Sequence, residues 1–263
     1  MYRESSADTL AYRFEDNAAW SLARQRLLAR FSQGPKPAVL DVGCHTGRFL
    51  AGLPVTWPRY GVESAREPIR IARDEHGATI IGERLESLGV EWSQSFDAVT
   101  MFDVVEHLPD PETGIAQAAR LVKPSGVLMV SSGNFDAWTW RWLGTGHWYL
   151  QTPQHLSFVS RRFLHGVADR HALTLTDTSS IPHRRAPRSR RLHETIQAVY
   201  WGLRRRRGIC RIPHRLLQSL PGLRTLRHMQ AAAWTMAISD HCLATFECIG
   251  GSPNATHSQS RGA

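Results

Sequence analysis

Short apolar runs alternate with amphipathic, helix-like segments between residues 38 and 131 of this chain. The runs with the pattern of buried strands are 38–43, 60–63, 78–81, 96–103 and 126–131. Strands that alternate with helices at this spacing form a parallel sheet, because each parallel connection needs a crossover. The pattern therefore predicts an α/β fold in which helices cover both faces of the sheet.

Further segments extend this sheet towards the C-terminus. Residues 173–178 and 242–248 predict a sixth and a last strand, which makes seven strands in all. Helices are expected at 15–31, 46–53, 67–76, 111–122, 160–171, 194–203 and 214–220. We expect four parts: an N-terminal helix with the main α/β domain (1–180), a basic helical insertion (181–236), the last strand (237–249) and a disordered tail (250–263).

The positive charge of the chain is concentrated in one segment. Thirteen arginines and a single acidic residue, Glu194, lie between Ile181 and His228. This segment carries +12 and the whole chain +9, so the remainder carries −3. A basic segment beside a nearly neutral body predicts either a local contact with an anionic partner or a solvated, arginine-rich helical face.

Cysteine usage and hydropathy restrict the class of protein. The four cysteines form no C-x-x-C pair, which argues against a zinc ribbon and against a disulfide framework. The N-terminal residues are polar and acidic, unlike a signal peptide. Every apolar run is shorter than the roughly 20 residues of a membrane-spanning helix. We therefore expect a cytoplasmic protein.

The run 40–47 (LDVGCHTG) carries the most specific functional signal. A strand leads into a glycine turn and then a helix, which is where doubly wound sheets bind ligands. Its G-x-x-x-G spacing differs from the G-x-G-x-x-G of a dinucleotide site, and Asp41 would repel a phosphate. S-adenosylmethionine carries an ammonium and a sulfonium but no phosphate, so the acid favours this cofactor. We expect Asp41, Gly43, Cys44 and Gly47 to bind it.

Residues after the next strands complete the expected cofactor site. Glu63 ends the second strand, 20 residues beyond Gly43, where a carboxylate accepts hydrogen bonds from ribose hydroxyls. Gly82 and Glu83 follow the third strand and are expected near the adenine, and Asp103 ends the fourth strand beside the same site. A nucleotide-binding oxidoreductase is the alternative, which this pairing of turn and acid disfavours.

At these residues the chain resembles the class I S-adenosylmethionine-dependent methyltransferases, and within them the ubiquinone-biosynthesis-like O-methyltransferase group. The resemblance covers about residues 37–180 and the last strand, through the segments VLDVGCHTGRFL, YGVE, FDAVTMFDVVEHLPDP, LVKPSGVLMVSSGN and HWYLQTPQHLSFVSRRFL. It implies a Rossmann-like, mostly parallel sheet, S-adenosylmethionine as cofactor and methyl transfer as reaction. A non-catalytic binding or scaffold protein of the same fold is the alternative.

The acceptor is expected to be a small molecule, methylated on a hydroxyl of a sugar, phenol or lipid-linked intermediate. Nucleic acid is not an expected partner, because residues 103–106 read DVVE where adenine-modifying relatives carry an Asn/Asp-Pro-Pro-aromatic tetrapeptide. A hydroxyl of high pKa needs a general base, for which His107 and His155 are the candidates. Either ring could instead have a structural role.

Some relatives bind a divalent ion through a Glu-x-x-Glu-His run, which here reads Asp103-x-x-Glu106-His107. Aspartate is one methylene shorter, and a hard ion wants more oxygen ligands than this run supplies. We therefore expect no metal, and this run is the site if one binds.

Two further segments have open interpretations. We expect the arginine-rich residues 184–215 to form a lid or a dimer contact. The second possibility is that they bind an anionic membrane surface, which would make the protein peripheral, and the third is that they bind RNA. The tryptophan-rich segment 138–148 is either an aromatic lid over the substrate or packing at the end of the sheet.

Overall fold

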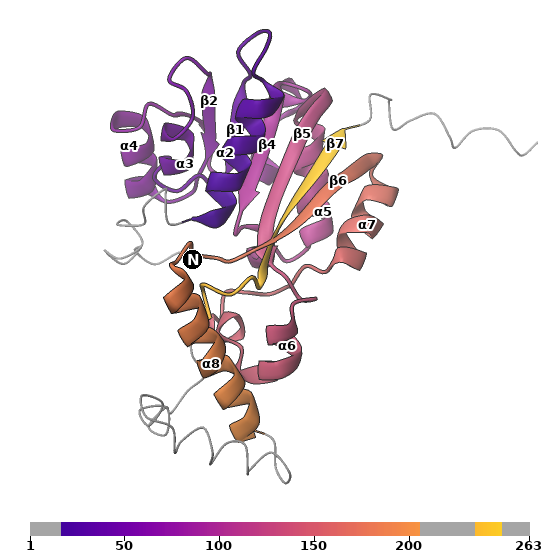
Figure 1. Cartoon of the computed structure of the whole chain (residues 1–263). Coiled ribbons are helices and arrows are strands. Elements are labelled where there is room, and N and C mark those ends of the chain that lie inside the picture. The colour runs from indigo at the N-terminus through magenta and orange to yellow at the C-terminus, as the bar shows by residue number, and fades with distance from the viewer. Residues whose placement is uncertain (1–16, 206–234, 249–263) are drawn as a thin grey trace, which may run out of the picture.

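The computed structural model describes residues 17–205 and 235–248, and these form one sheet with helices on both faces (Figure 1). The strands are β1 (Val39–Val42), β2 (Arg59–Val62), β3 (Thr79–Gly82), β4 (Phe96–Phe102), β5 (Val122–Gly133), β6 (Leu173–Ile181) and β7 (His241–Cys248). Their order is β3-β2-β1-β4-β5-β7-β6, and only β7 runs antiparallel to its neighbours β5 and β6. The predicted seven-stranded, mostly parallel sheet is confirmed.

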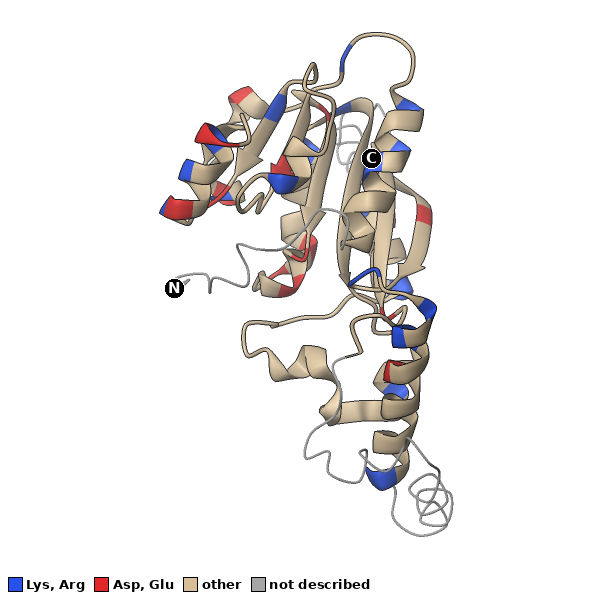
Figure 2. Cartoon of the chain, turned by 60° about the vertical axis from the view of Figure 1, so that its left-hand side comes forward, with Lys and Arg blue, Asp and Glu red and all other residues tan. Residues whose placement is uncertain are grey.

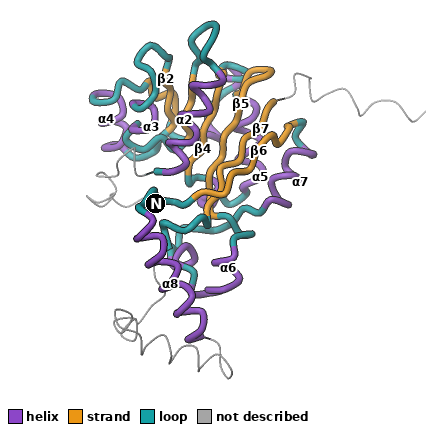
Figure 3. Tube along the Cα trace, in the orientation of Figure 1, coloured by secondary structure: helices purple, strands orange, loops and turns teal. Residues whose placement is uncertain are grey.

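The helices flank this sheet and form a smaller layer beyond one edge (Figure 3). They are α2 (Ala18–Arg30), α3 (Arg48–Ala51), α4 (Arg66–Asp74), α5 (Pro111–Arg120), α6 (Trp138–Leu143), α7 (Arg161–Arg170) and α8 (Arg188–Arg205). Helices α6 and α8 contact each other below the sheet in Figure 1, on the side where β5 leads into α6. None of the described helices combines the length and the apolarity that crossing a bilayer requires.

Burial on both faces explains why the strands are apolar throughout. All four residues of β1 are buried, with Leu40 and Val42 in the core on one face and Val39 in the core on the other. Such two-sided burial is usual for parallel strands between helical layers. Local signals then set the helix starts, as where the Asn17 side chain accepts the backbone N–H of Trp20 at 2.9 Å.

Several element boundaries differ from the sequence prediction. Helix α3 begins only at Arg48, because Gly47 has the left-handed φ of 75°. Strand β6 continues to Ile181, three residues beyond the prediction, because its polar end still pairs with β7. Helix α8 begins at Arg188, six residues earlier than expected. The division of the chain into four parts stays a prediction, and the expected helix at 214–220 and the tail at 250–263 lie outside the described residues.

Candidate active site

The turn after β1 depends on two glycines with left-handed backbone. Gly43 has φ of 72° and Gly47 has φ of 75°. A Cβ on Gly43 would lie 2.7 Å from Cγ2 of Val104, and a Cβ on Gly47 would lie 3.1 Å from that of Ala72. The backbone N–H groups of Gly43 and Cys44 donate to the carbonyl of Val62, at 2.8 and 3.0 Å. The turn is therefore tied to the end of β2.

Glu63 lies at this turn, as its spacing in the sequence predicts. Its Oε2 accepts the backbone N–H of His45 at 2.9 Å, while Oε1 accepts the N–H groups of Ser64 and Ala65, both at 2.8 Å. Its own N–H donates to the carbonyl of Gly82 at 3.2 Å. The structure thus brings Glu63, the glycine turn and the end of β3 together, whereas Glu83 is exposed just beyond β3.

Asp41 and Cys44 are buried beneath the turn. Oδ1 of Asp41 accepts the hydroxyl of Thr100 at 2.6 Å, and Asp41 is only 3% exposed. Burial raises the pKa of Asp41 to about 7, with the Thr100 hydrogen bond opposing and the charge of Glu63 adding to the rise. Burial also raises the pKa of the Cys44 thiol well above its usual value. An ammonium placed near Asp41 would favour its ionised form.

Asp103 and Glu106 follow β4 but face different neighbours. Asp103 has a left-handed φ of 54°, and its Oδ2 lies 3.7 Å from Nδ1 of His183, after β6. Glu106, in a short 3₁₀ helix (Val105–His107), is 1% exposed. Its carboxylate accepts the hydroxyls of Tyr149 and Ser132, the latter at 2.9 Å. Burial, followed by the charge of Asp103, raises the pKa of Glu106 to about 7.

The two histidines predicted as general bases lie together. The ring centroids of His107 and His155 are 5.0 Å apart. Nδ1 of His107 lies 3.0 Å from the carbonyl of Gln154, and Nδ1 of His155 lies 2.8 Å from that of Tyr149. Burial is the main cause that lowers the pKa of His155. Each ring therefore has one nitrogen at a carbonyl, an arrangement compatible with both the catalytic and the structural interpretation.

The predicted metal run Asp103-x-x-Glu106-His107 does not come together as one set of ligands. Among the described residues, Asp103 groups with His183 and His241, whereas Glu106 groups with His107 and His155. The left-handed turn at Asp103 separates the two sets, since it directs the chain into the 3₁₀ helix. The three residues of this run therefore do not fall in one group of possible ligands, and the expectation that no metal binds to the run stays a prediction.

The tryptophan-rich segment is mainly packing at the end of the sheet. Trp140 and Trp148 are buried, and Trp140 stacks on His147 with ring centroids 4.1 Å apart. Trp138 is exposed, so it is the tryptophan of this segment most available to a ligand. Asn134 accepts the N–H of Asp136 at 3.1 Å and so closes a turn.

Sequence analysis missed two buried polar networks at this end of the sheet. One joins Tyr149 to Glu106, and the other joins Asp240 to His241, with Nδ1 of His241 and Oδ1 of Asp240 3.0 Å apart. The partners are 43 residues apart in the first pair, so no local pattern connects them. The sequence signal for the second pair is an acid next to a histidine, Asp240-His241, within an apolar stretch.

Comparisons with known proteins place the chain in a family. A family profile described as a methyltransferase domain matches residues 11–178. The ubiquinone biosynthesis O-methyltransferase of Proteus mirabilis is 34% identical over 122 residues, which is 43% of this chain and 48% of that protein. The protein of the same name from Serratia proteamaculans is 33% identical over 147 residues, which is 50% of this chain and 59% of that protein. The chain thus spans about half the length of the curated relatives it matches.

Solved structures agree on the fold. The YcgJ protein of Bacillus subtilis aligns with a TM-score of 0.57 and 15% identity, covering 89% of this chain and 99% of that one. A SAM-dependent methyltransferase of Thermotoga maritima aligns with a TM-score of 0.51 and 15% identity, covering 87% and 90%. The predicted methyltransferase family is confirmed: the chain belongs to the methyltransferase domain family.

Proposed function

We propose that this chain transfers a methyl group from S-adenosylmethionine to a hydroxyl of a small molecule. The observation that carries this proposal is the hydrogen bond from the His45 N–H to the Glu63 carboxylate, because a carboxylate beside the glycine turn supports recognition of a ribose diol there. The relatives named as ubiquinone biosynthesis O-methyltransferases support an oxygen acceptor. A sugar, a phenol or a lipid-linked intermediate is the class of acceptor that we infer.

In this proposal the cofactor lies along the carboxyl ends of β1 to β4. Asp41, Gly43, Cys44 and Gly47 surround its methionine end, and Glu63 accepts the ribose hydroxyls. Gly82 and Glu83 lie on the adenine side, and Asp103 lies towards the transferred methyl group.

Methyl transfer requires mainly that the acceptor oxygen is aligned with the methyl group. Methyl transfer is an in-line displacement at a carbon activated by positive sulfur, so the protein must hold the acceptor oxygen in line and exclude water. His155, held by the Tyr149 carbonyl, is the first candidate to remove the hydroxyl proton, and His107 is the second. Burial lowers the pKa of His155 and so favours the neutral ring, which is the form that can accept a proton.

A labelled-methyl screen tests the function. The chain would be incubated with S-adenosylmethionine labelled in its methyl group and panels of phenols, sugars and isoprenoid-linked phenols. We expect label in one class, as an ether that resists mild base. Cofactor binding without transfer to any panel would favour the alternative, a non-catalytic protein of the same fold.

Helix α8 supports a further part of the proposal, that the basic segment acts as a lid or a dimer contact. Its apolar side is buried against α6, where the Trp142 indole donates to the carbonyls of Ala198 and Val199 at 3.0 and 3.3 Å. Glu194 accepts the backbone N–H of Ala237 at 2.6 Å and so fixes α8 to the segment before β7. The described part of the proposed contact segment, 184–205, is therefore anchored on one side.

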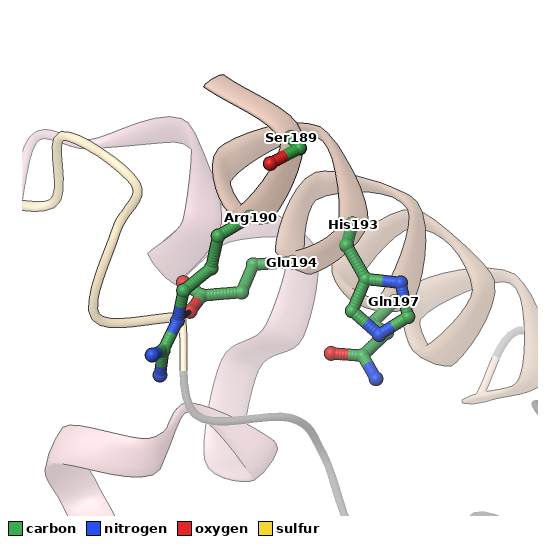
Figure 4. Close-up of a pocket in the computed structure, with 5 residues that line it drawn as sticks. All are labelled: Ser189, Arg190, His193, Glu194 and Gln197. Atoms are coloured by element: carbon green, nitrogen blue, oxygen red, sulfur yellow. Dashed lines mark hydrogen bonds and ion pairs between the residues drawn. The ribbon is translucent and has the colours of Figure 1, made fainter. Parts of the chain in front are cut away.

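The other side of α8 is basic and open. Figure 2 shows the arginines of α8 near its two ends, and Figure 4 shows Arg190 and Glu194 side by side. Nε of Arg190 lies 2.9 Å from Oε1 of Glu194. Arg188, Arg191 and the apolar Leu192 are exposed near its start. An anionic membrane surface is the second partner that fits such a face. Salt-sensitive sedimentation with anionic vesicles would support the membrane, and a monomer–dimer equilibrium in ultracentrifugation would support the dimer.

A further inference from the structure

Three possible metal ligands meet at the carboxyl edge of the sheet, outside the residues assigned to the general base. Asp103 follows β4, His183 follows β6, and His241 opens β7. Because β7 is antiparallel, its first residue lies at the same edge as the ends of β4 and β6. One ligand atom from each of the three side chains lies within 4.8 Å of the other two.

His241 offers a nitrogen that the protein leaves without a partner. The residue is 2% exposed, and its Nε2 has no hydrogen-bond partner among the described residues. Its Nδ1 lies 3.0 Å from Oδ1 of Asp240, which is fully buried. A carboxylate can only accept, so Nδ1 carries a proton, and in the neutral ring Nε2 carries a lone pair. An unpaired buried acceptor is costly, which points to an absent ligand.

The surroundings of Asp240 fix this arrangement. Its Oδ2 accepts the hydroxyl of Thr235 at 3.0 Å and the indole N–H of Trp148 at 3.3 Å. Nε2 of His147 lies 3.3 Å from the same oxygen, and Nδ1 of His147 accepts the N–H of Tyr149, so Nε2 bears the proton. A histidine oriented by a hydrogen-bonded carboxylate is the usual support of a metal ligand. Asp240 is thus a positioning residue for His241.

The space between the three side chains suits an ion. They line a small hollow that has no room for an organic molecule. The 3.7 Å between Oδ2 of Asp103 and Nδ1 of His183 is too long for a hydrogen bond. Two atoms that each lie about 2.0–2.2 Å from one ion are about 3–4 Å apart, so this separation fits shared coordination.

We propose that Asp103, His183 and His241 bind one divalent transition-metal ion. Two imidazoles and one carboxylate favour Zn²⁺, Fe²⁺ or Co²⁺ over Mg²⁺, which prefers oxygen ligands. Three protein ligands leave at least one position for water or an acceptor oxygen. The ion lies at the end of β4, beside the proposed methyl-transfer site. Its binding is measured in the absence of S-adenosylmethionine and of any methyl acceptor.

The second cluster, Glu106 with His107 and His155, is a weaker candidate. Both oxygens of Glu106 already accept hydroxyls, from Tyr149 and Ser132. Nδ1 of each histidine lies at a backbone carbonyl instead of a carboxylate. No nitrogen or oxygen of its three side chains is buried and unpartnered among the described residues. This cluster therefore serves as the comparison in the experiment.

Calorimetry with Zn²⁺ and visible spectroscopy with Co²⁺ test the proposal on the chelator-treated full chain. We expect one tight site per chain and a Co²⁺ spectrum of low-symmetry N/O coordination. Asp103→Asn, His183→Gln and His241→Ala should each weaken binding at least about 100-fold, and Asp240→Asn about 10–100-fold. His155→Ala, in the comparison cluster, and His165→Ala, on the exposed face of α7, should bind as the wild type does.

Three results would overturn the proposal. They are absence of a tight site in the wild type, unchanged affinity in the Asp103 and His183 variants, and loss of the site in His155→Ala alone. If His241→Ala does not fold, His183→Gln decides, because that side chain is 18% exposed and its replacement leaves the core intact. X-ray absorption on the wild-type zinc complex should give two imidazoles at about 2.0–2.1 Å. Failure of methyl transfer would leave these measurements unaffected.

Discussion

Oε2 of Glu63 accepts the backbone N–H of His45 at 2.9 Å, so the acid after β2 holds the glycine turn after β1. The other oxygen, Oε1, holds the next two N–H groups of the chain, those of Ser64 and Ala65. Three of the roughly four lone-pair sites of this carboxylate are therefore occupied, so one ribose hydroxyl would use the free site on Oε2 and the second would share or displace an N–H group at Oε1. Preorganisation of this kind lowers the cost of ordering the site on binding.

Replacing Glu63 with alanine should nearly abolish cofactor binding. The variant loses both the acceptors for the ribose diol and the support of the turn at His45, so we expect at least about 100-fold weaker affinity in calorimetry with S-adenosylmethionine. Glu67→Ala is the matched control, since Glu67 is a largely exposed acid in the first turn of α4. Equal affinity in the two variants would contradict the assignment of Glu63.

Gly43→Ala should destabilise the fold and lower the affinity for the cofactor. An alanine there must adopt φ of 72°, at a cost of about 1–2 kcal/mol, and its Cβ meets Val104 at 2.7 Å. Gly34→Ala is the control, because Gly34 also has a left-handed φ, 94°, but open space at its Cβ. In urea unfolding Gly43→Ala should lose more stability than Gly34→Ala. Equal losses would show that contact with Val104 does not matter.

Asp41→Asn should change how stability depends on pH. The pKa of Asp41 rises from 3.8 to about 7 on folding, so the folded chain binds the proton more tightly. Stability is then highest below the unfolded pKa and falls as pH rises towards 7. Asparagine cannot ionise, so the unfolding free energies of variant and wild type should diverge by about 2–3 kcal/mol in the variant's favour from pH 5 to pH 8. Parallel pH profiles would show that Asp41 ionises as it does in water.

His155→Ala should lower kcat by about 100-fold or more, with little change in KM, if the ring removes the acceptor proton. Because burial lowers the pKa of His155, the wild-type rate should hold its plateau to below pH 6.5. The rates come from labelled-methyl transfer to the acceptor that the screen identifies, and His165→Ala on α7 is the control. A raised KM with unchanged kcat would instead assign the ring to shaping the pocket. The same comparison applied to His107→Ala ranks the two histidines.

The fold could be predicted because its signals are local. The apolar run at β1 is buried on both faces, and the proline and aspartate at the start of α5 mark that helix directly. Boundaries were less accurate where pairing overrides pattern, as at the polar end of β6, which stays in the sheet only because β7 lies beside it. A single strand cannot reveal such support from a partner 60 residues away.

The residues of the candidate site also divide into those that local sequence predicts and those that depend on distant strand pairing. Gly43 and Glu63 directly follow neighbouring strands, β1 and β2, so spacing alone predicts that they meet. The Asp240–His241 pair and its approach to Asp103 depend on β7 inserting between β5 and β6, which no spacing specifies. Likewise the run 103–107 does not reveal that Asp103 lies with His183 and His241 while Glu106 lies with His107 and His155, because these partners are distant in the sequence.

A crystal structure of the chain with S-adenosylmethionine tests the central claim most directly. We expect the ribose hydroxyls to lie within hydrogen-bond distance of the Glu63 carboxylate, and the methionine end of the cofactor to lie over the turn between Gly43 and Gly47. A cofactor bound elsewhere would contradict the assignment of Glu63. So would a crystal grown at saturating S-adenosylmethionine in which no cofactor is bound at the turn.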